Sequence, residues 1–153
     1  SVAACFVCHA PPTTVTYPLS LHDALPIYPF GYGLSYTTFR FSDITLNRSS
    51  IGMDNELVAS VTVTNTGDRA GSEVVQLYIR DLVGSVTRPV KELKGFEKIY
   101  LQPNESRTVR FTIAPEMLKF YNADLKFVAE PGDFDVMIGP DSRNVKTARF
   151  TLR

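Results

Sequence analysis

The chain lacks a net charge and a long apolar run, and it has only two cysteines. Its 16 Lys and Arg residues balance 16 Asp and Glu residues, which leaves no basic surface of the kind that binds nucleic acid or an anionic membrane. No stretch approaches the roughly 18 apolar residues of a membrane-spanning helix. Cys5 and Cys8 both lie near the N-terminus, so the rest of the chain has no disulfide framework. Neither nucleic acid nor a membrane is an expected partner.

Hydrophobic residues nevertheless make up 44% of the 153 residues, which is enough for the core of one domain. From Tyr28 onward the chain shows alternating apolar and polar residues, which indicate strands with one buried face. The segments with this pattern are residues 57–64, 74–80, 108–113, 133–138 and 147–152. Before Tyr28 there is little periodicity, and the chain therefore divides into two unequal parts.

Two further strands need an irregularity. Phe39 and Phe41 share a face with Ile44 and Leu46 only if a bulge lies near residues 42–43. A mixed strand over residues 93–101 contains Gly95, which marks a bulge or a close backbone approach.

Turn signals separate these strands. They lie at residues 65–68, where Asn and Gly tolerate positive φ, at Pro103-Asn104, and at Pro131-Gly132, which suits a type II turn. A short helical turn is expected over residues 116–120, after Pro115. About seven short strands without long helices predict an all-β fold, an antiparallel sandwich of the immunoglobulin or fibronectin type III-like kind.

Four runs carry a resemblance to a known family. They are residues 28–37 (YPFGYGLSYT), 61–71 (VTVTNTGDRAG), 73–81 (EVVQLYIRD) and 88–96 (RPVKELKGF). In order and spacing they resemble the C-terminal fibronectin type III-like region of glycoside hydrolase family three, the β-glucosidase and β-xylosidase family, over about four fifths of the chain.

The resemblance implies a sandwich over residues 39–153 and a linker over residues 28–38 that comes from a missing catalytic domain. The family's chemistry uses an aspartate nucleophile and a separate general acid, and both are supplied upstream of the matched region. No catalytic residue, cofactor or metal ligand is therefore expected here. By resemblance, the domain packs against the catalytic domains of its parent enzyme, and that enzyme is periplasmic or secreted in a bacterium.

Residues 1–27 are expected to be non-native and disordered. Residues 20–27 (SLHDALPI) back-translate to TCC CTA CAC GAC GCT CTT CCG ATC, which reads as a sequencing-library adapter in frame. Such segments are excluded from fold reasoning. Within them, Cys5-Phe6-Val7-Cys8-His9 fits the attachment pattern of c-type haem, but Pro11-Pro12 stops any helix at once. A zinc site with His22 is disfavoured for want of a rigid, closed set of ligands.

Two groups in the second part suggest chemistry. Asp133 and Asp135 share a strand face, but neighbouring carboxylates on one strand cannot easily flank a sugar ring, so a solvated face is the expected interpretation. Five tyrosines could form a sugar-stacking platform, namely Tyr32, Tyr36, Tyr78, Tyr100 and Tyr121. The absence of Trp weakens that idea, and packing is favoured for them.

A basic cluster, Arg88, Lys91 and Lys94, lies in the long connection after Asp81. Long connections often carry contacts to partners. The residues predicted to dock on the catalytic domain are Tyr32, Tyr36, Arg88, Lys91 and Phe96, with an oligosaccharide at the domain interface as a further possible partner. An apolar patch is expected over residues 28–39, where that partner would lie. The alternative function is a free-standing carbohydrate-binding or adhesive β-sandwich.

Overall fold

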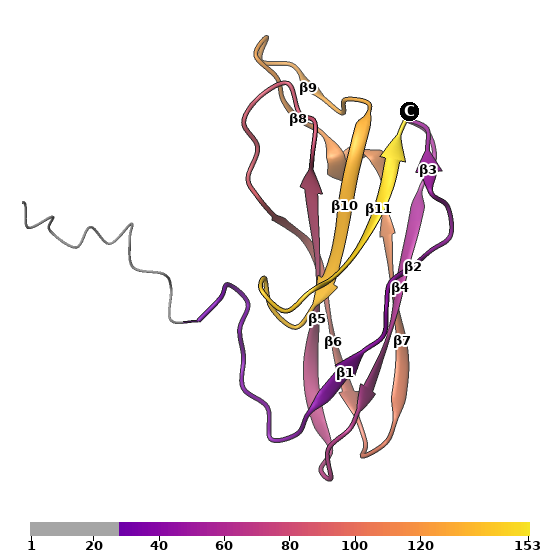
Figure 1. Ribbon diagram of the computed structural model, residues 1–153, viewed down its shortest axis with the longest axis vertical. Helices are drawn as coiled ribbons and strands as arrows, with labels where there is room; N and C mark the ends of the chain where they lie inside the picture. The colour runs from indigo at the N-terminus through magenta and orange to yellow at the C-terminus, as the bar shows by residue number, and fades with distance from the viewer. Residues whose placement is uncertain (1–27) are drawn as a thin grey trace, which may run out of the picture.

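The computed structural model describes residues 28–153, which form an elongated sandwich of two sheets (Figure 1). The haem-like, zinc and adapter-like segments all precede Tyr28 and lie outside the described residues. The predicted sandwich is confirmed, and the long strands follow the alternation of the sequence. No helix within residues 28–153 is long and apolar enough to cross a bilayer.

The first sheet, sheet A, is built on β4, which pairs with β1 and β2 along one edge and with β7 along the other. Its strands are β1 (Phe39–Phe41), β2 (Thr45–Leu46), β4 (Leu57–Asn65) and β7 (Ser106–Ile113). Phe41 pairs with Val63 and Thr45 with Ser60, so four steps along one strand oppose three along the other. This extra residue is the predicted bulge near residues 42–43.

The second sheet, sheet B, has the order β3-β11-β10-β5-β6. Its strands are β3 (Ser50–Ile51), β5 (Gly71–Asp81), β6 (Glu92–Leu101), β10 (Gly132–Gly139) and β11 (Lys146–Leu152). Leu77 pairs with Gly95 and Tyr78 pairs with Leu93, so Lys94 is the extra residue of a bulge, as Gly95 predicted. The other strand pairs are antiparallel, but β3 runs parallel to β11.

Smaller elements connect the two sheets at the end where the C-terminus lies (Figure 1). They are the 3₁₀ helix η1 (Pro115–Leu118), β8 (Phe120–Tyr121) and β9 (Phe127–Val128). The helical turn expected over residues 116–120 is confirmed in part, because the helix includes Pro115 and ends at Leu118, and Phe120 belongs to β8. Pro115 lies at the start of the helix, where a missing N–H costs nothing. In the β8–β9 hairpin, the side-chain Oδ1 of Asn122 accepts hydrogen bonds from the backbone N–H groups of Asp124 and Lys126, both at 3.0 Å.

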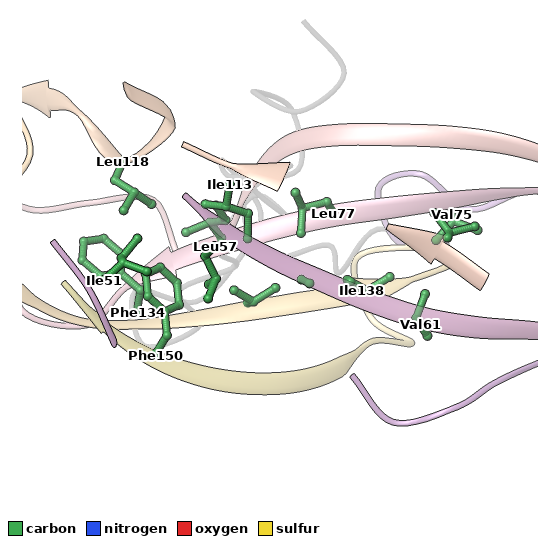
Figure 2. Packing of buried hydrophobic residues seen from close by; sticks show 14 of the residues in the cluster. Ile51, Leu57, Val61, Val75, Leu77, Ile113, Leu118, Phe134, Ile138 and Phe150 are labelled. Carbon is green, nitrogen blue, oxygen red and sulfur yellow. The ribbon is translucent and has the colours of Figure 1, made fainter. Parts of the chain in front are cut away.

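The core lies between the two sheets and consists of alternate residues of the long strands. In β4 every second residue from Leu57 to Val63 is buried, and β10 supplies Phe134, Val136 and Ile138 in the same way. Figure 2 shows residues of both sheets pointing toward one another, among them Leu57, Val61, Leu77, Ile113 and Ile138. The rings of Phe134 and Phe150 stack with their centroids 5.4 Å apart.

The turns agree less well with the sequence-based predictions than the strands do. At Pro103-Asn104 the turn forms as expected, with Asn104 at φ 63° and the Glu105 N–H donating to the Gln102 carbonyl at 3.0 Å. The prediction of a type II turn at Pro131-Gly132 is wrong. Among the described residues only Gly31, Asn104 and Leu125 have positive φ, and Gly132 is the first residue of β10, where it pairs with Leu152.

Candidate docking face

The outer faces of the two sheets differ in chemistry. On sheet A, the outer side chains of β4 and β7 are mostly hydroxyls, which bond one another across the strands, as between Thr62 and Thr108 at 3.1 Å. On sheet B, Tyr78 lies opposite Leu93 and Gln76 lies opposite Phe96. Phe96 is 67% exposed, although the solvent-facing side of an antiparallel sheet normally carries polar side chains. The outer face of sheet B is therefore the one with unpartnered apolar surface.

The leading segment, defined as residues 28–36, runs outside the sandwich (Figure 1) and contacts this face of sheet B through Gln76 of β5. The Ser142 N–H donates to the Phe30 carbonyl at 2.9 Å, and the Tyr32 N–H donates to the Pro29 carbonyl at 3.1 Å. The rings of Tyr28 and Tyr32 stack at 4.8 Å between centroids. The segment that was predicted to be a linker is thus fastened to the sandwich.

An open groove of about 730 Å³ lies where the leading segment meets β5 and β6. It is lined by Pro29, Phe30, Tyr78, Val90, Lys91, Leu93, Ser142 and Arg143. Phe30 and Val90 are both about two thirds exposed, so the groove has apolar walls that face solvent. We call the surface made by Phe30, Val90, Leu93 and Phe96 the docking face. The predicted apolar patch over residues 28–39 is confirmed in part of its length, because Tyr28, Phe30, Leu34 and Tyr36 are exposed.

Two titratable groups lie beneath the leading segment. Burial opposes ionisation of Asp141, but hydrogen bonds from the Asn144 side chain and from the Asn144 and Arg143 backbone N–H groups hold the pKa of its carboxyl below the usual value. The distances to the two backbone nitrogens are both 2.8 Å. Burial raises the pKa of the Tyr78 hydroxyl, and the Asp141 charge raises it further. Asp141 is thus a charged anchor of the β10–β11 turn rather than a free acid.

The lowered pKa of Asp141 makes the stability of the domain pH-dependent. An acid with a lowered folded pKa adds stability above its unfolded pKa, and this stability is lost as the pH falls through the folded value. We expect Asp141→Asn to lower the free energy of unfolding by about 1–2 kcal/mol at neutral pH and to lose that difference in acid. Urea unfolding at neutral pH and near pH 3 measures it.

The contribution of Asp141 has to be measured as the difference between the unaltered chain and Asp141→Asn, because Glu73 changes the stability with pH in the opposite direction. Burial raises the pKa of Glu73, the Val74 N–H lowers it, and the Asp141 charge raises it, for a net increase, so acid favours the folded state through this group. Asp54→Asn, at an exposed position, is the matched control. An equal loss for Asp141→Asn at both pH values would contradict the role given to the Asp141 charge.

Of the five residues predicted to dock, Phe96 belongs to the docking face, Lys91 lines the groove, and Tyr32 lies in the leading segment. Tyr32 stacks on Tyr28, Phe96 is exposed on β6, and Lys91 lines the groove, where its Nζ donates to the Ser142 carbonyl at 2.5 Å. Tyr36 is 92% exposed and does not line the groove. Arg88 does not line the groove either.

Arg88 is engaged within the domain. Its guanidinium lies 4.4 Å from the centroid of the Phe120 ring, and its Nη2 forms an ion pair with Glu92 at 2.5 Å. Lys94 binds the same carboxylate at 2.7 Å. Arg88 therefore holds the β5–β6 connection against β6 and β8, whereas Lys94 and its partner Glu92 both lie on β6.

Asp133 and Asp135 are occupied by partners on β11. Thr151 donates to Asp133 at 2.7 Å, and Arg149 Nε donates to Asp135 at 2.8 Å. The expected solvated face is wrong for Asp135, which is almost buried. The two pairs follow from the register, which places Asp133 opposite Thr151 and Asp135 opposite Arg149. Both carboxylates are structural cross-strand partners.

The five tyrosines do not form one platform. Tyr78 is buried and its hydroxyl donates to Gln76 Oε1 at 2.6 Å. Tyr121 is exposed on the β8–β9 hairpin, where it contacts Phe127 with the ring planes tilted by 44°. Tyr100 lies on β6 and Tyr36 in the leading segment. Among residues 28–153 no cluster of three His, Cys, Asp or Glu side chains could hold a metal ion.

Sequence reasoning missed the residues that fasten the leading segment. Gln76 appeared only as an outer position of an alternating strand, Tyr78 was also considered for a sugar-stacking platform, and no prediction was made for Ser142 or Arg143. The sequence did contain one signal. Val74, Gln76 and Tyr78, which share the outer side of β5, are unusually apolar or bulky for a side that faces solvent. This composition indicates that something covers the face.

Known proteins with similar sequence and structure are much longer than this chain. A family model of the fibronectin type III-like domain matches residues 73–142. The chain is 56% identical over 127 residues to the periplasmic β-glucosidase of Salmonella typhimurium, covering 83% of this chain and 17% of that protein. It is 53% identical over 128 residues to a putative β-xylosidase of Formosa agariphila, covering 84% of this chain and 17% of that protein.

Solved structures give the same result. A β-glucosidase from Erythrobacter marinus superposes with a TM-score of 0.82 at 49% identity, over 90% of this chain and 18% of that one. A β-glucosidase from Listeria innocua in complex with glucose superposes with a TM-score of 0.79 at 42% identity, over 83% of this chain and 18% of that one. The chain thus spans about a sixth of the length of the curated relatives it matches. It belongs to the fibronectin type III-like domains of glycoside hydrolase family three enzymes.

Proposed function

We propose that this chain is a non-catalytic accessory domain of a β-glucosidase-like enzyme, and that it stabilises the catalytic domains by packing on them through the docking face. The observation that carries this proposal is the position of the leading segment. The chain reaches the sandwich along a sheet face that keeps apolar side chains in solvent, and Pro29 and Phe30 of that segment line the groove. A domain that precedes residue 28 is therefore adjacent to the docking face.

The chemistry of the docking face fits a protein partner in the same chain. Phe30, Val90, Leu93 and Phe96 supply apolar contacts, and Lys91 and Arg143 lie at the groove as polar neighbours. Apolar anchors surrounded by polar groups are typical of contacts between domains. In this proposal residues 28–38 connect the catalytic part of the enzyme to the sandwich of residues 39–153.

Within residues 28–153, the carboxylates give no support to glycoside hydrolysis. Asp133 and Asp135 are bound to Thr151 and Arg149. Asp141 holds the β10–β11 turn through its own hydrogen bonds. Hydrolysis needs two carboxyl groups on either side of one glycosidic bond, and these side chains are committed to the fold instead.

A free-standing carbohydrate-binding module is the second candidate, and the exposed Tyr121 and Phe127 pair is the feature that favours it. The ring planes are tilted by 44°, so the two rings cannot both lie flat on one pyranose. Titration of cello-oligosaccharides into the chain separates the two functions. Saturable binding that Tyr121→Ala abolishes would favour the binding module.

The proposed function can be tested in a hybrid enzyme. The 127 matched residues of the Salmonella β-glucosidase are replaced by the matching residues of this chain. We expect the isolated chain to be inert on a chromogenic β-glucoside, the hybrid to be active, and an enzyme without the segment to lose activity rapidly on warming. Turnover by the isolated chain, or full thermal stability of the shortened enzyme, contradicts the proposal.

A pair of matched variants locates the contact within the hybrid. Phe96→Ala removes an apolar group from the docking face, and loss of such an anchor typically weakens a contact by about 1–2 kcal/mol. We expect thermal inactivation about tenfold faster for this variant. Phe127→Ala makes the same change on the β8–β9 hairpin and should have little effect. Equal inactivation rates for Phe96→Ala and the unaltered hybrid would place the contact elsewhere.

A further inference from the structure

The leading segment is fastened at its centre by one buried amide. Gln76 lies on the outer side of β5 and is only 5% exposed. Its Nε2 donates to the Gly31 carbonyl at 3.0 Å and to the Pro140 carbonyl at 2.5 Å. Its Oε1 accepts the Tyr78 hydroxyl at 2.6 Å. Both donor hydrogens and the acceptor are thus used, as expected of a buried side-chain amide.

This arrangement, the amide clamp of Gln76, Tyr78, Gly31 and Pro140, joins three parts of the chain. Gln76 and Tyr78 belong to β5, Gly31 to the leading segment, and Pro140 to the turn between β10 and β11. The Ser142 N–H adds a bond to the Phe30 carbonyl. Because Phe30 and Gly31 are bonded at two consecutive carbonyls, the contacts fix the direction of the segment as well as its position.

The backbone at residue 31 is shaped for this contact. Gly31 has φ +79°, a conformation that glycine adopts without the strain a Cβ would bring. A Cβ at this position would overlap the Gln76 side chain at its Oε1 atom. The close approach of the segment to the amide therefore depends on glycine at 31 as well as on glutamine at 76.

We propose that Gln76 is a positioning residue, which holds the leading segment in one direction so that the sandwich is attached rigidly rather than on a flexible tether. The inference rests on the proposed function, because the direction of the segment sets how the docking face meets the catalytic part of the chain. A rigid attachment lowers the entropy lost when two linked surfaces meet. Gln76 thereby favours docking without contacting the partner.

Hydrogen exchange of the full chain, followed by mass spectrometry, tests the clamp. Gln76→Glu keeps the shape of the side chain but removes both donors and adds a charge among carbonyl oxygens. We expect exchange at the Tyr32 and Ser142 amides to accelerate at least about tenfold, while the buried strands β4 and β10 keep their protection. Gln102→Glu makes the same change at an exposed residue and should leave both amides unchanged.

Two further measurements separate a local clamp from a general loss of stability. A protonated carboxyl can donate one hydrogen bond, so part of the lost protection in Gln76→Glu should return near pH 4, relative to Gln102→Glu. Gly31→Ala changes the leading segment and removes no side chain from the core, and it should release the same two amides. The inference is overturned if these amides are unprotected in the unaltered chain, or if Gln76→Glu and Gly31→Ala both leave them protected.

The exchange readout is independent of the hybrid enzyme. Release of the leading segment in Gln76→Glu, together with a hybrid that needs no accessory domain, would retain the clamp and refute the proposed function. Amide protection that does not change in Gln76→Glu, together with a hybrid sensitive to Phe96→Ala, would refute the clamp and retain the proposed function.

Discussion

Asn65→Asp is expected to lower the free energy of unfolding by about 3 kcal/mol or more, because the change leaves a charge in a site built for an amide. Asn65 is fully buried at the end of β4. Its Nδ2 donates to the carbonyls of Arg69 and Leu101 at 2.7 and 3.1 Å. Its Oδ1 accepts from the Gly67 N–H and the Thr37 hydroxyl at 3.1 and 2.7 Å. A carboxylate keeps the second pair of bonds but faces two carbonyl oxygens in place of the first.

Urea unfolding followed by tyrosine fluorescence measures this loss, since the chain has no tryptophan. Burial raises the pKa of a carboxyl in such a site, so the loss should shrink as the pH falls and the introduced group becomes neutral. Asn55→Asp, at an exposed position, is the matched control and should change stability by less than about 0.5 kcal/mol. A loss below about 1 kcal/mol for Asn65→Asp would show that the network is dispensable.

Asn65 also shows where sequence reasoning is right for the wrong reason. A turn over residues 65–68 was predicted because Asn and Gly tolerate positive φ, and a turn does follow β4. Neither Asn65 nor Gly67 has positive φ. The turn is held instead by the Asn65 side chain, which bonds the Gly67 N–H and the Arg69 carbonyl and also reaches Leu101 at the end of β6. A contact between residues 36 positions apart cannot be inferred from a local turn motif.

The long strands were predictable because their alternation has a period that no helix shares. The extra residue between β1 and β2 was predictable for the same reason, since only a shift restores the apolar residues to one face. The bulge at Lys94 was indicated instead by Gly95, which marks a bulge or a close backbone approach. The turn at Pro131-Gly132 was not predictable from the dipeptide alone. Gly132 pairs with Leu152, and that pairing with a distant strand determines its conformation.

The candidate docking face was only partly predictable. Lys91 and Phe96 were recognised because the connection after Asp81 and the neighbouring strand carry basic and aromatic residues. Arg88 lies in the same connection but contacts Phe120 and Glu92, which depends on where β8 packs. The amide clamp joins residues 31, 76 and 140, and no pattern along the chain indicates that these meet.

The second large effect is expected for Phe134→Ala, which empties part of the core. Phe134 is 1% exposed and stacks on Phe150 at 5.4 Å (Figure 2). Truncating a buried Phe to Ala typically lowers the free energy of unfolding by about 3–5 kcal/mol, from lost apolar burial and from the cavity left behind. Urea unfolding of the isolated chain measures it. Phe96→Ala is the matched control in the same experiment and should cost less than about 1 kcal/mol, because this ring is already in water.

The hybrid enzyme should respond to both variants, whereas the isolated chain should respond only to Phe134→Ala, and this difference distinguishes a docked domain from one that makes no contact. Phe134→Ala acts through the fold of the sandwich, so the hybrid should inactivate at the temperature at which the weakened domain unfolds. Phe96→Ala leaves the sandwich intact, so its effect on the hybrid must come from the contact with the catalytic part. If Phe134→Ala unfolds the isolated chain but leaves the thermal inactivation of the hybrid unchanged, the catalytic domains do not depend on this one. A hybrid sensitive to both variants, beside an isolated chain sensitive only to Phe134→Ala, is the result that docking requires.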